Sequence, residues 1–153
     1  MCKIGDKVKV DVNIKKLYND SIIPTKGTEK AGGFDLYAHV VDKVYIPAHS
    51  TVKVKTGVAL EVPDNAIGGI FPRSGLATKH GLRPANCVGV IDTDYRGEVI
   101  VALHNDTDFP KKIECGDRIA QLIFIPILDV KLNEVEELSE TKRGDGGFGS
   151  TGN

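Results

Sequence analysis

The stretch NCVGVIDTDYRGEVI, which runs from Asn86 to Ile100, decides the fold class. Apolar and β-branched residues stand at both of its ends, and the polar centre holds Asp92, Asp94 and Tyr95 just before the turn signal Arg96-Gly97. This pattern predicts a β-hairpin with the two aspartates and the tyrosine at its tip. Because Asp92 follows an apolar strand end, we expect its carboxylate to be partly desolvated, the setting in which a carboxylate becomes an effective general base. The alternative is an ordinary hairpin with an acidic turn.

Short strands are expected on both sides of this segment. Four apolar residues, Val8, Val10, Val12 and Ile14, alternate with polar ones over residues 7–15, a period of two that places them on one strand face. Further short runs rich in β-branched or aromatic residues occupy 52–55, 58–62, 66–71, 99–103 and 119–127. Only the segment from Ser74 to His80 predicts a helical turn. Many short strands without a long amphipathic helix predict an all-β sandwich or barrel, in one domain.

The composition excludes several classes of protein. The 153 residues include 20 Lys plus Arg and 21 Asp plus Glu, for a net charge of -1, which argues against a general nucleic-acid binder with a basic face. Cys2, Cys87 and Cys115 show no CxxC spacing, and the 4 histidines show no metal-ligand spacing, so neither a structural zinc site nor a disulfide framework is expected. The longest apolar run, 122–128, is too short to span a membrane, and the first residues have no signal-peptide core. We therefore expect a soluble, cytoplasmic protein.

The segment PRSGLAT, residues 72–78, is a candidate for binding an anion. Arg73 presents a forked donor suited to phosphate oxygens. Ser74 stands where the helical turn begins, so its hydroxyl and the following N–H groups can point at one anion. The alternative is that Ser74 only caps the turn and that Arg73 pairs with a surface carboxylate.

The segment GDRIAQLIF, residues 116–124, places two polar residues in an otherwise apolar strand. A buried polar side chain needs a hydrogen-bonding partner. Arg118 and Gln121 therefore face either solvent or a functional site.

The glycine-rich segment RGDGGFGSTG, residues 143–152, has too few apolar residues to form a packed strand or helix by itself. Its formal GxGxxG match is spurious, because that motif needs a strand before it and a helix after it. A loose tail is one reading. The other is a lid, because glycine-rich backbone can wrap phosphates with its N–H groups, and this segment also holds an Arg, a Ser, a Thr and a Phe.

Five segments together, in this order and at this spacing, resemble the five motifs of trimeric dUTPases. The segments are AGGFDLYA from Ala31, PRSGLATKHGL from Pro72, GVIDTDYRG from Gly89, DRIAQLIF from Asp117 and RGDGGFGSTG from Arg143. The resemblance implies a distorted β-barrel or jelly-roll protomer over residues 1–138 and a flexible glycine-rich arm over residues 139–153. It also implies a homotrimer with active sites at the subunit interfaces, where the arm closes over a site of a neighbouring subunit.

The resemblance further implies hydrolysis of dUTP to dUMP and pyrophosphate, which keeps uracil out of DNA and supplies dUMP for dTMP synthesis. Asp92 would position and activate the attacking water, and Tyr95 would stack on the deoxyribose and exclude a 2′-hydroxyl. The uracil would be bound by Asn86 and by four residues of the hairpin, Gly89, Val90, Ile91 and Ile100.

The phosphates would be held by four residues of the second and fourth motifs: Arg73, Ser74, Gly75 and Gln121. Mg²⁺ would bridge the phosphates, and Asp35 would contact it through bound water. On closure of the arm, Phe148 would cover the uracil. The γ-phosphate would be met by Arg143 together with Gly149, Ser150 and Thr151.

Two alternatives to this function remain open. A dCTP deaminase of the same fold would carry a catalytic Glu on the strand after the hairpin, but this chain has Ala102 there, between Val101 and Leu103. The other is a dUTP-responsive regulatory module that binds a partner protein, as an addition to catalysis or in place of it.

Overall fold

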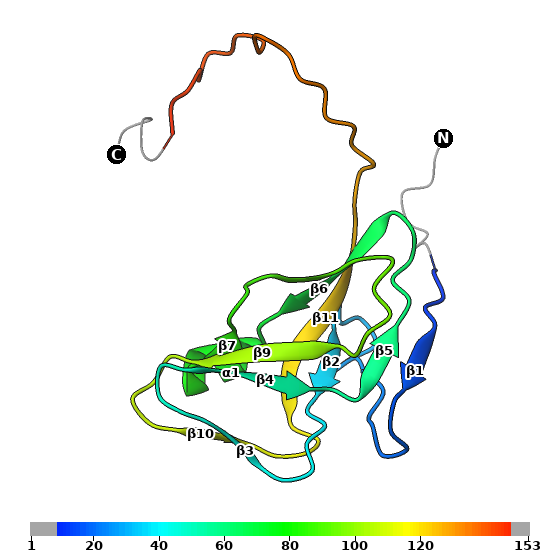
Figure 1. Cartoon of the computed structure of the whole chain (residues 1–153), viewed down its shortest axis with the longest axis vertical. Helices are drawn as coiled ribbons and strands as arrows, with labels where there is room; N and C mark the ends of the chain where they lie inside the picture. The colour runs from blue at the N-terminus through cyan, green and yellow to red at the C-terminus, as the bar shows by residue number, and fades with distance from the viewer. Residues whose placement is uncertain (1–8, 148–153) are drawn as a thin grey trace.

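The computed structural model describes residues 9–147, which form eleven short strands and one helix. In chain order the elements are β1 (Ile14–Lys16), β2 (Phe34–Tyr37), β3 (Val44–Ile46), β4 (Thr51–Lys55), β5 (Val58–Leu60), β6 (Ala66–Phe71), α1 (Ser74–His80), β7 (Leu82–Pro84), β8 (Gly89–Ile91), β9 (Ile100–Asn105), β10 (Lys111–Ile113) and β11 (Arg118–Pro126). The predicted all-β class with one short helical turn is therefore confirmed (Figure 1).

Two larger sheets enclose the core. One has the strand order β2-β11-β6-β8 and the other β4-β9-β7, while β1 pairs with β5 and β10 with β3. A single apolar cluster joins the inner faces, with fully buried residues from the first sheet (Leu36, Leu122) and from the second (Val54, Leu103). These two packed layers agree with the predicted distorted barrel or jelly roll, and within residues 9–147 the strands form separate sheets and no closed ring.

The alternation in the sequence accounts for most of the strand faces. In β4, Val52 and Val54 point inward while Lys53 and Lys55 are exposed. The longest strand, β11, pairs antiparallel with β2 on one side and with β6 on the other, so it is an interior strand of its sheet. The predicted strand 66–71 and the predicted helical turn Ser74–His80 match β6 and α1.

The predicted strand over 7–15 is mostly wrong. Residues 1–8 lie outside the described part of the chain, and the strand that is formed starts at Ile14 and ends at Lys16. Val10 is exposed, because pairing with β5 begins only where the main chain of Asn13 accepts a hydrogen bond from Glu61 N–H at 2.9 Å. Alternation alone does not make a strand where no partner strand lies alongside.

The predicted hairpin over 86–100 is also wrong in its pairing. The strand β8 pairs with β6, whereas β9 pairs with β4 and β7, so the two arms of the segment belong to different sheets. The segment does turn at its predicted tip, where Tyr95 N–H donates to Asp92 O at 3.2 Å. The arms separate because each finds a longer partner in its own sheet, and the space between them becomes a pocket.

Two glycines allow the close approaches that position the site. A Cβ on Gly68 would lie 3.1 Å from Ile91 Cβ and 3.3 Å from Leu122 Cδ1, so a glycine here lets β8 and β11 pack tightly beside β6. Gly81 ends α1 in the left-handed region, with φ 64°, and its N–H bonds to Ala77 O at 3.1 Å.

After β11 the chain leaves the two sheets as an extended segment, seen in orange to red in Figure 1. Among the described residues, its last backbone hydrogen bond to the sheets is from Ile127 N–H to Asn65 O, at 2.8 Å. Several apolar residues between β11 and the predicted arm are largely exposed: Leu128, Val130, Leu132, Val135 and Leu138. Within residues 9–147, no helix has the length and apolar character needed to cross a membrane.

Candidate active site

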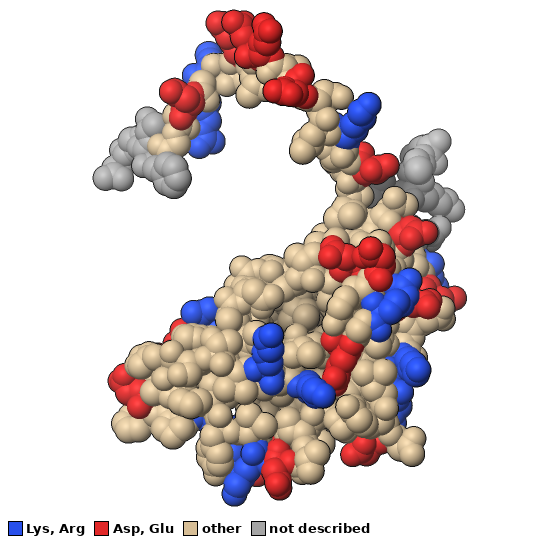
Figure 2. Space-filling view, in the orientation of Figure 1, with Lys and Arg blue, Asp and Glu red and all other residues tan. Residues whose placement is uncertain are grey.

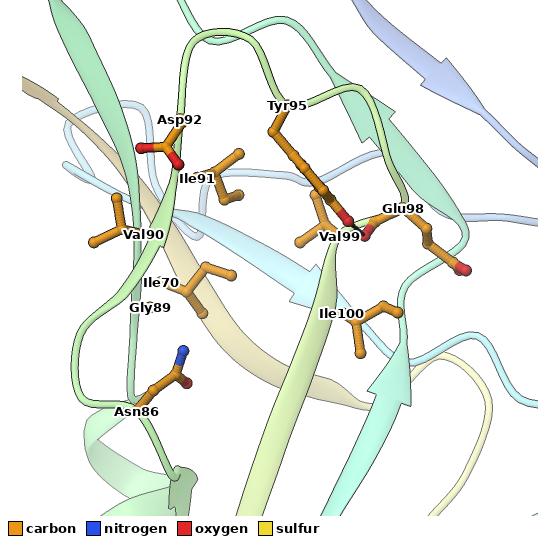
Figure 3. A pocket seen from close by; sticks show the side chains of 10 residues that line it. All are labelled: Ile70, Asn86, Gly89, Val90, Ile91, Asp92, Tyr95, Glu98, Val99 and Ile100. Carbon is orange, nitrogen blue, oxygen red and sulfur yellow. Dashed lines mark hydrogen bonds between the residues drawn. The ribbon is translucent and has the colours of Figure 1, made fainter.

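The first pocket lies between β8 and β9, where the predicted hairpin opens (Figure 3). We call it the β8–β9 pocket. Its lining residues are Ile70, Asn86, Gly89, Val90, Ile91, Asp92, Tyr95, Glu98, Val99 and Ile100. Seven of these were predicted to bind substrate, and the structure brings all seven to one place. Sequence reasoning missed Ile70, Glu98 and Val99, of which Ile70 comes from β6 and could be found only through strand pairing.

Tyr95 is held in place at the edge of this pocket. Its hydroxyl donates to Glu98 O at 2.9 Å, the bond drawn in Figure 3. The ring folds over Gly97, where a Cβ would lie 2.6 Å from Tyr95 Cζ, so this position needs a residue without a side chain. The partly buried Glu98 carboxylate in turn accepts from Gly57 N–H at 2.8 Å. The tyrosine ring is therefore fixed before any ligand arrives.

Asp92 is exposed, which contradicts the expected desolvation of its carboxylate. It follows the buried Ile91, but the turn that begins at Asp92 carries the side chain out to the rim of the pocket. A carboxylate at the rim can accept hydrogen bonds from water or from a ligand hydroxyl. Desolvation of this group would require a ligand or another chain to cover it.

Asn86 stands at the other end of the pocket from Asp92 (Figure 3). Its amide has one acceptor and two donor hydrogens. Gly89 packs closely behind it, because a Cβ there would lie 3.1 Å from Asn86 Nδ2. This end of the pocket is therefore formed by the main chain at Gly89 and the side-chain amide of Asn86, and the pocket is also lined by the buried residues Ile91 and Val99.

The second pocket lies beside the helix, and we call it the α1 pocket. Its lining residues are Asp35, Arg73, Ser74, Gly75, Leu76, Lys79, His80 and Gln121. The structure thus brings together Asp35 and the four phosphate-binding residues predicted from the second and fourth motifs. It adds three residues that sequence reasoning missed, Leu76, Lys79 and His80. Because Ser74 and Gly75 also lie on this seven-residue helix, its turn spacing could have indicated them.

An ion pair joins two predicted residues of the α1 pocket. Arg73 Nε donates to Asp35 Oδ1 at 2.8 Å, and the Asp35 side chain is only 14% exposed. Arg73 thus pairs with a carboxylate that lines the pocket and not with a surface carboxylate, as the alternative had it. Ser74 is exposed and makes no capping hydrogen bond, so the alternative that it only caps the helix is wrong.

Gln121 enters the same pocket from β11. It pairs in register with Asp35 on β2 and with Phe71 on β6, and its Nε2 donates to Pro72 O at 2.8 Å. Gly33 makes room for it, since a Cβ there would lie 2.9 Å from Gln121 Oε1. Gln121 therefore lines a pocket and does not face open solvent, and its role in a functional site stays a prediction.

A divalent metal would find one carboxylate in the α1 pocket. No group of three or more His, Cys, Asp or Glu that could hold an ion occurs in the part of the chain that the structure describes. Asp35 already bonds Arg73 through Oδ1 and Arg118 through Oδ2, at 2.8 and 3.3 Å. Its remaining lone pairs suit contact with metal-bound water, which fits Mg²⁺, an ion that keeps several waters and binds phosphate oxygens.

Only part of the predicted arm site can be placed. Arg143 is exposed, and its Nε donates to Gly146 O at 2.8 Å. Phe148, Gly149, Ser150 and Thr151 lie outside the described residues. Figure 2 shows acidic and basic side chains interspersed both along the extended segment after β11 and on the visible face of the two sheets, with no continuous basic stripe among the residues drawn in colour.

Comparison with known proteins identifies the family. The family model described as dUTPase matches residues 19–152, which include both pockets and the arm. The chain belongs to the dUTPase family.

Individual relatives agree with this assignment. A deoxyuridine 5'-triphosphate nucleotidohydrolase of Hydrogenobaculum sp. is 48% identical over 139 residues, which cover 91% of this chain and 96% of the relative. The dUTPase of Staphylococcus bacteriophage 80alpha with dUpNHpp superposes with a TM-score of 0.86 at 27% identity, over 94% of this chain and 99% of that one. A dUTPase of S. aureus phage phi11, described with a structural Mg(II) ion, shares the fold with a TM-score of 0.77 at 22% identity, over 86% of this chain and 100% of that one.

Proposed function

We propose that this chain hydrolyses dUTP to dUMP and pyrophosphate, with uracil and deoxyribose in the β8–β9 pocket and the triphosphate at the α1 pocket. The observation that carries the proposal is the β8–β9 pocket in a chain of the dUTPase family. This pocket is lined by the Asn86 amide, the Tyr95 ring and the exposed Asp92 carboxylate. In a cell this reaction would keep uracil out of DNA and supply dUMP for dTMP synthesis.

The base would bind along the floor of the β8–β9 pocket. Uracil presents a row of alternating acceptors and donors, and the Asn86 amide and the main chain of β8 carry complementary groups. The strand β8 has a strand neighbour only at β6 among the described residues, so its other edge faces the pocket. The buried Ile91 and Val99 leave little depth below this floor, which disfavours the methyl group of thymine.

The sugar would stack against Tyr95. Because the hydroxyl of this residue is tied to Glu98 O, the ring cannot swing away to admit a 2′-hydroxyl. A fixed ring therefore selects deoxyribose over ribose by sterics.

Asp92 would act as the general base. Its carboxylate accepts a proton from water, the water oxygen bonds to the α-phosphorus, and the bond from that phosphorus to the bridging oxygen breaks. Pyrophosphate leaves with the bridging oxygen and its electron pair. The exposed position of Asp92 in the single chain means that substrate and neighbouring chains would supply the exclusion of bulk water.

The phosphates would be held by the donors of the α1 pocket, which are Arg73, Ser74, Gly75 N–H and Gln121. Bound Mg²⁺ would neutralise developing charge on the phosphate oxygens, and Asp35 would orient its waters. Arg143, with Phe148 and the residues after it, would complete the site when the arm closes.

A homotrimer accounts for two features of the single chain. The β8–β9 pocket and the α1 pocket share no lining residue, and in a trimer one substrate would use these two pockets from different protomers. The exposed apolar residues between Leu128 and Leu138 need a surface to cover them. We propose residues 1–138 as the protomer body and 139–153 as the arm that closes over a neighbour's site, in a cytoplasmic enzyme.

Two other functions are less well supported. The strand β9 carries no carboxylate, and Ala102 occupies the position where a deaminase would need its acid, so deamination of dCTP lacks a catalyst. A regulatory role beside catalysis is a second candidate, since the phage dUTPases in the comparison are described as controlling transfer of virulence genes.

The deciding experiment measures pyrophosphate release from dUTP, dCTP, dTTP and UTP, each with Mg²⁺ and with excess chelator. We expect magnesium-dependent release from dUTP alone. Release from none of the four would overturn catalysis and favour the regulatory role. Ammonia release from dCTP would overturn the argument from Ala102.

A further inference from the structure

Arg118 contacts both members of the ion pair in the α1 pocket, although it does not line that pocket. Its Nη1 lies 3.3 Å from Asp35 Oδ2, and its backbone oxygen accepts a hydrogen bond from Arg73 Nη1 at 3.2 Å. Arg73 Nε meanwhile donates to Asp35 Oδ1 at 2.8 Å. Three residues from β2, β11 and the loop after β6 thus form one connected group, which we call the Arg73–Asp35–Arg118 triad.

The triad fixes the direction of Arg73. Two of its nitrogens, Nε and Nη1, are bound to a carboxylate and to a main-chain oxygen, so its guanidinium plane cannot rotate without breaking both bonds. The donors on Nη2 make no hydrogen bond to any residue of 9–147 and can meet an anion in the pocket. A preoriented guanidinium loses less side-chain entropy when the anion binds.

The triad also determines the net charge beside the α1 pocket. Arg73 and Asp35 alone would form a neutral pair with side chains 26% and 14% exposed, which has little attraction for a polyphosphate. Arg118, which is 51% exposed, adds a second positive charge to the same carboxylate and leaves the group with a net charge of +1. The strand pairing of β11 with β2, Arg118 opposite Tyr37 and Gln121 opposite Asp35, holds this arrangement.

We propose that Arg118 is a positioning residue for triphosphate binding, acting through Asp35 and Arg73 and not by contact with the substrate. This inference rests on the proposed function, because it assigns the α1 pocket to the phosphates. It also gives a role to the exposed arginine at the start of β11, whose guanidinium contacts Asp35 on β2 and whose carbonyl accepts from Arg73 in the loop after β6.

The test compares binding of the non-hydrolysable analogue dUpNHpp with binding of dUMP, by calorimetry on the assembled protein. In Arg118→Ala we expect the Kd for dUpNHpp to rise about tenfold and the Kd for dUMP to change less than about twofold. Arg118→Lys restores the charge and should recover most of the affinity for dUpNHpp. If Arg118→Ala does not fold, the same comparison in Arg118→Gln decides, with the same expected result.

A double-mutant cycle separates positioning from direct contact. When Arg73 is already replaced by alanine, Arg118→Ala should weaken dUpNHpp binding less than it does in the wild-type background, because the orienting part of its effect passes through Arg73 and only the effect of its charge remains. A full additional loss would overturn the proposal, as would an unchanged Kd for dUpNHpp in Arg118→Ala or an equal weakening of dUMP.

The matched control is Arg83→Ala. Arg83 lines neither pocket and forms a similar pair with Asp106, at 2.8 and 2.9 Å, which holds the pKa of the Asp106 carboxyl below its usual range. We expect both Kd values to stay at the wild-type level. Failure of the proposed function would look different, since wild-type protein would then release no pyrophosphate from dUTP while the binding comparison could still be made.

Discussion

Replacing Gly89 by alanine should weaken nucleotide binding without unfolding the protein. The added Cβ would lie 3.1 Å from Asn86 Nδ2 and 3.3 Å from Ile70 Cβ, so a neighbour must move by a few tenths of an ångström. Ile70 is buried in a paired strand, whereas Asn86 is exposed, so the Asn86 amide is the group that moves. The perturbation is therefore a displaced amide at the floor of the β8–β9 pocket.

The magnitude follows from the hydrogen bonds that the amide would make to uracil. Losing an acceptor and a donor contact costs about 1–3 kcal/mol, which raises Kd about 5- to 150-fold. The free energy of unfolding should change by less than about 1 kcal/mol, because alanine lowers the entropy of the unfolded chain while it introduces mild crowding.

The assay is calorimetric titration with dUpNHpp, beside thermal unfolding followed by circular dichroism. Gly32→Ala is the control, because a Cβ at Gly32 meets nothing within 4 Å. In an Asn86→Ala background, Gly89→Ala should have little further effect on binding. The reasoning is refuted if Gly89→Ala binds dUpNHpp as tightly as wild type, or if it weakens binding equally with and without Asn86.

Four further predictions test other parts of the site and the fold. Asp92→Asn should lower kcat about 10²- to 10⁴-fold and leave the Kd for dUpNHpp nearly unchanged, and near-normal turnover would mean that another group is the base. Tyr95→Ala should reduce the preference for dUTP over UTP in kcat/KM about 10- to 100-fold, whereas unchanged selectivity would move sugar discrimination elsewhere. Removing residues 139–153 should lower kcat by at least about tenfold while gel filtration still reports a trimer, and a monomer would give the arm a structural role. Asn105→Ala should lower the free energy of unfolding by about 3 kcal/mol in urea at fixed protein concentration, because this fully buried amide donates to Ile46 O, Pro47 O and Phe109 O at 3.1, 3.2 and 2.8 Å; a change under about 1 kcal/mol would contradict this.

Local patterns were enough to predict the elements that are determined locally. The apolar run at 66–71 and the helical turn from Ser74 to His80 both match the structure, because strand faces and a short helix depend on residues near in sequence. The order of the five motifs likewise pointed to the residues of both pockets. The arm residues from Phe148 to Thr151 lie outside the described part of the chain, and their roles stay predictions.

Tertiary structure decided which strands pair and therefore what each motif faces. The apolar ends around Asp92 predicted a hairpin, but β8 pairs with β6 and β9 pairs with β4 and β7, so the two arms of the segment lie in different sheets. The same long-range register places Asp35 between Arg73 and Arg118, which are 38 and 83 residues away in sequence. Sequence by itself thus determined which residue types are available for the chemistry, and the pairing of distant strands determined which of them meet, since a contact across tens of residues leaves no periodic signal in the chain.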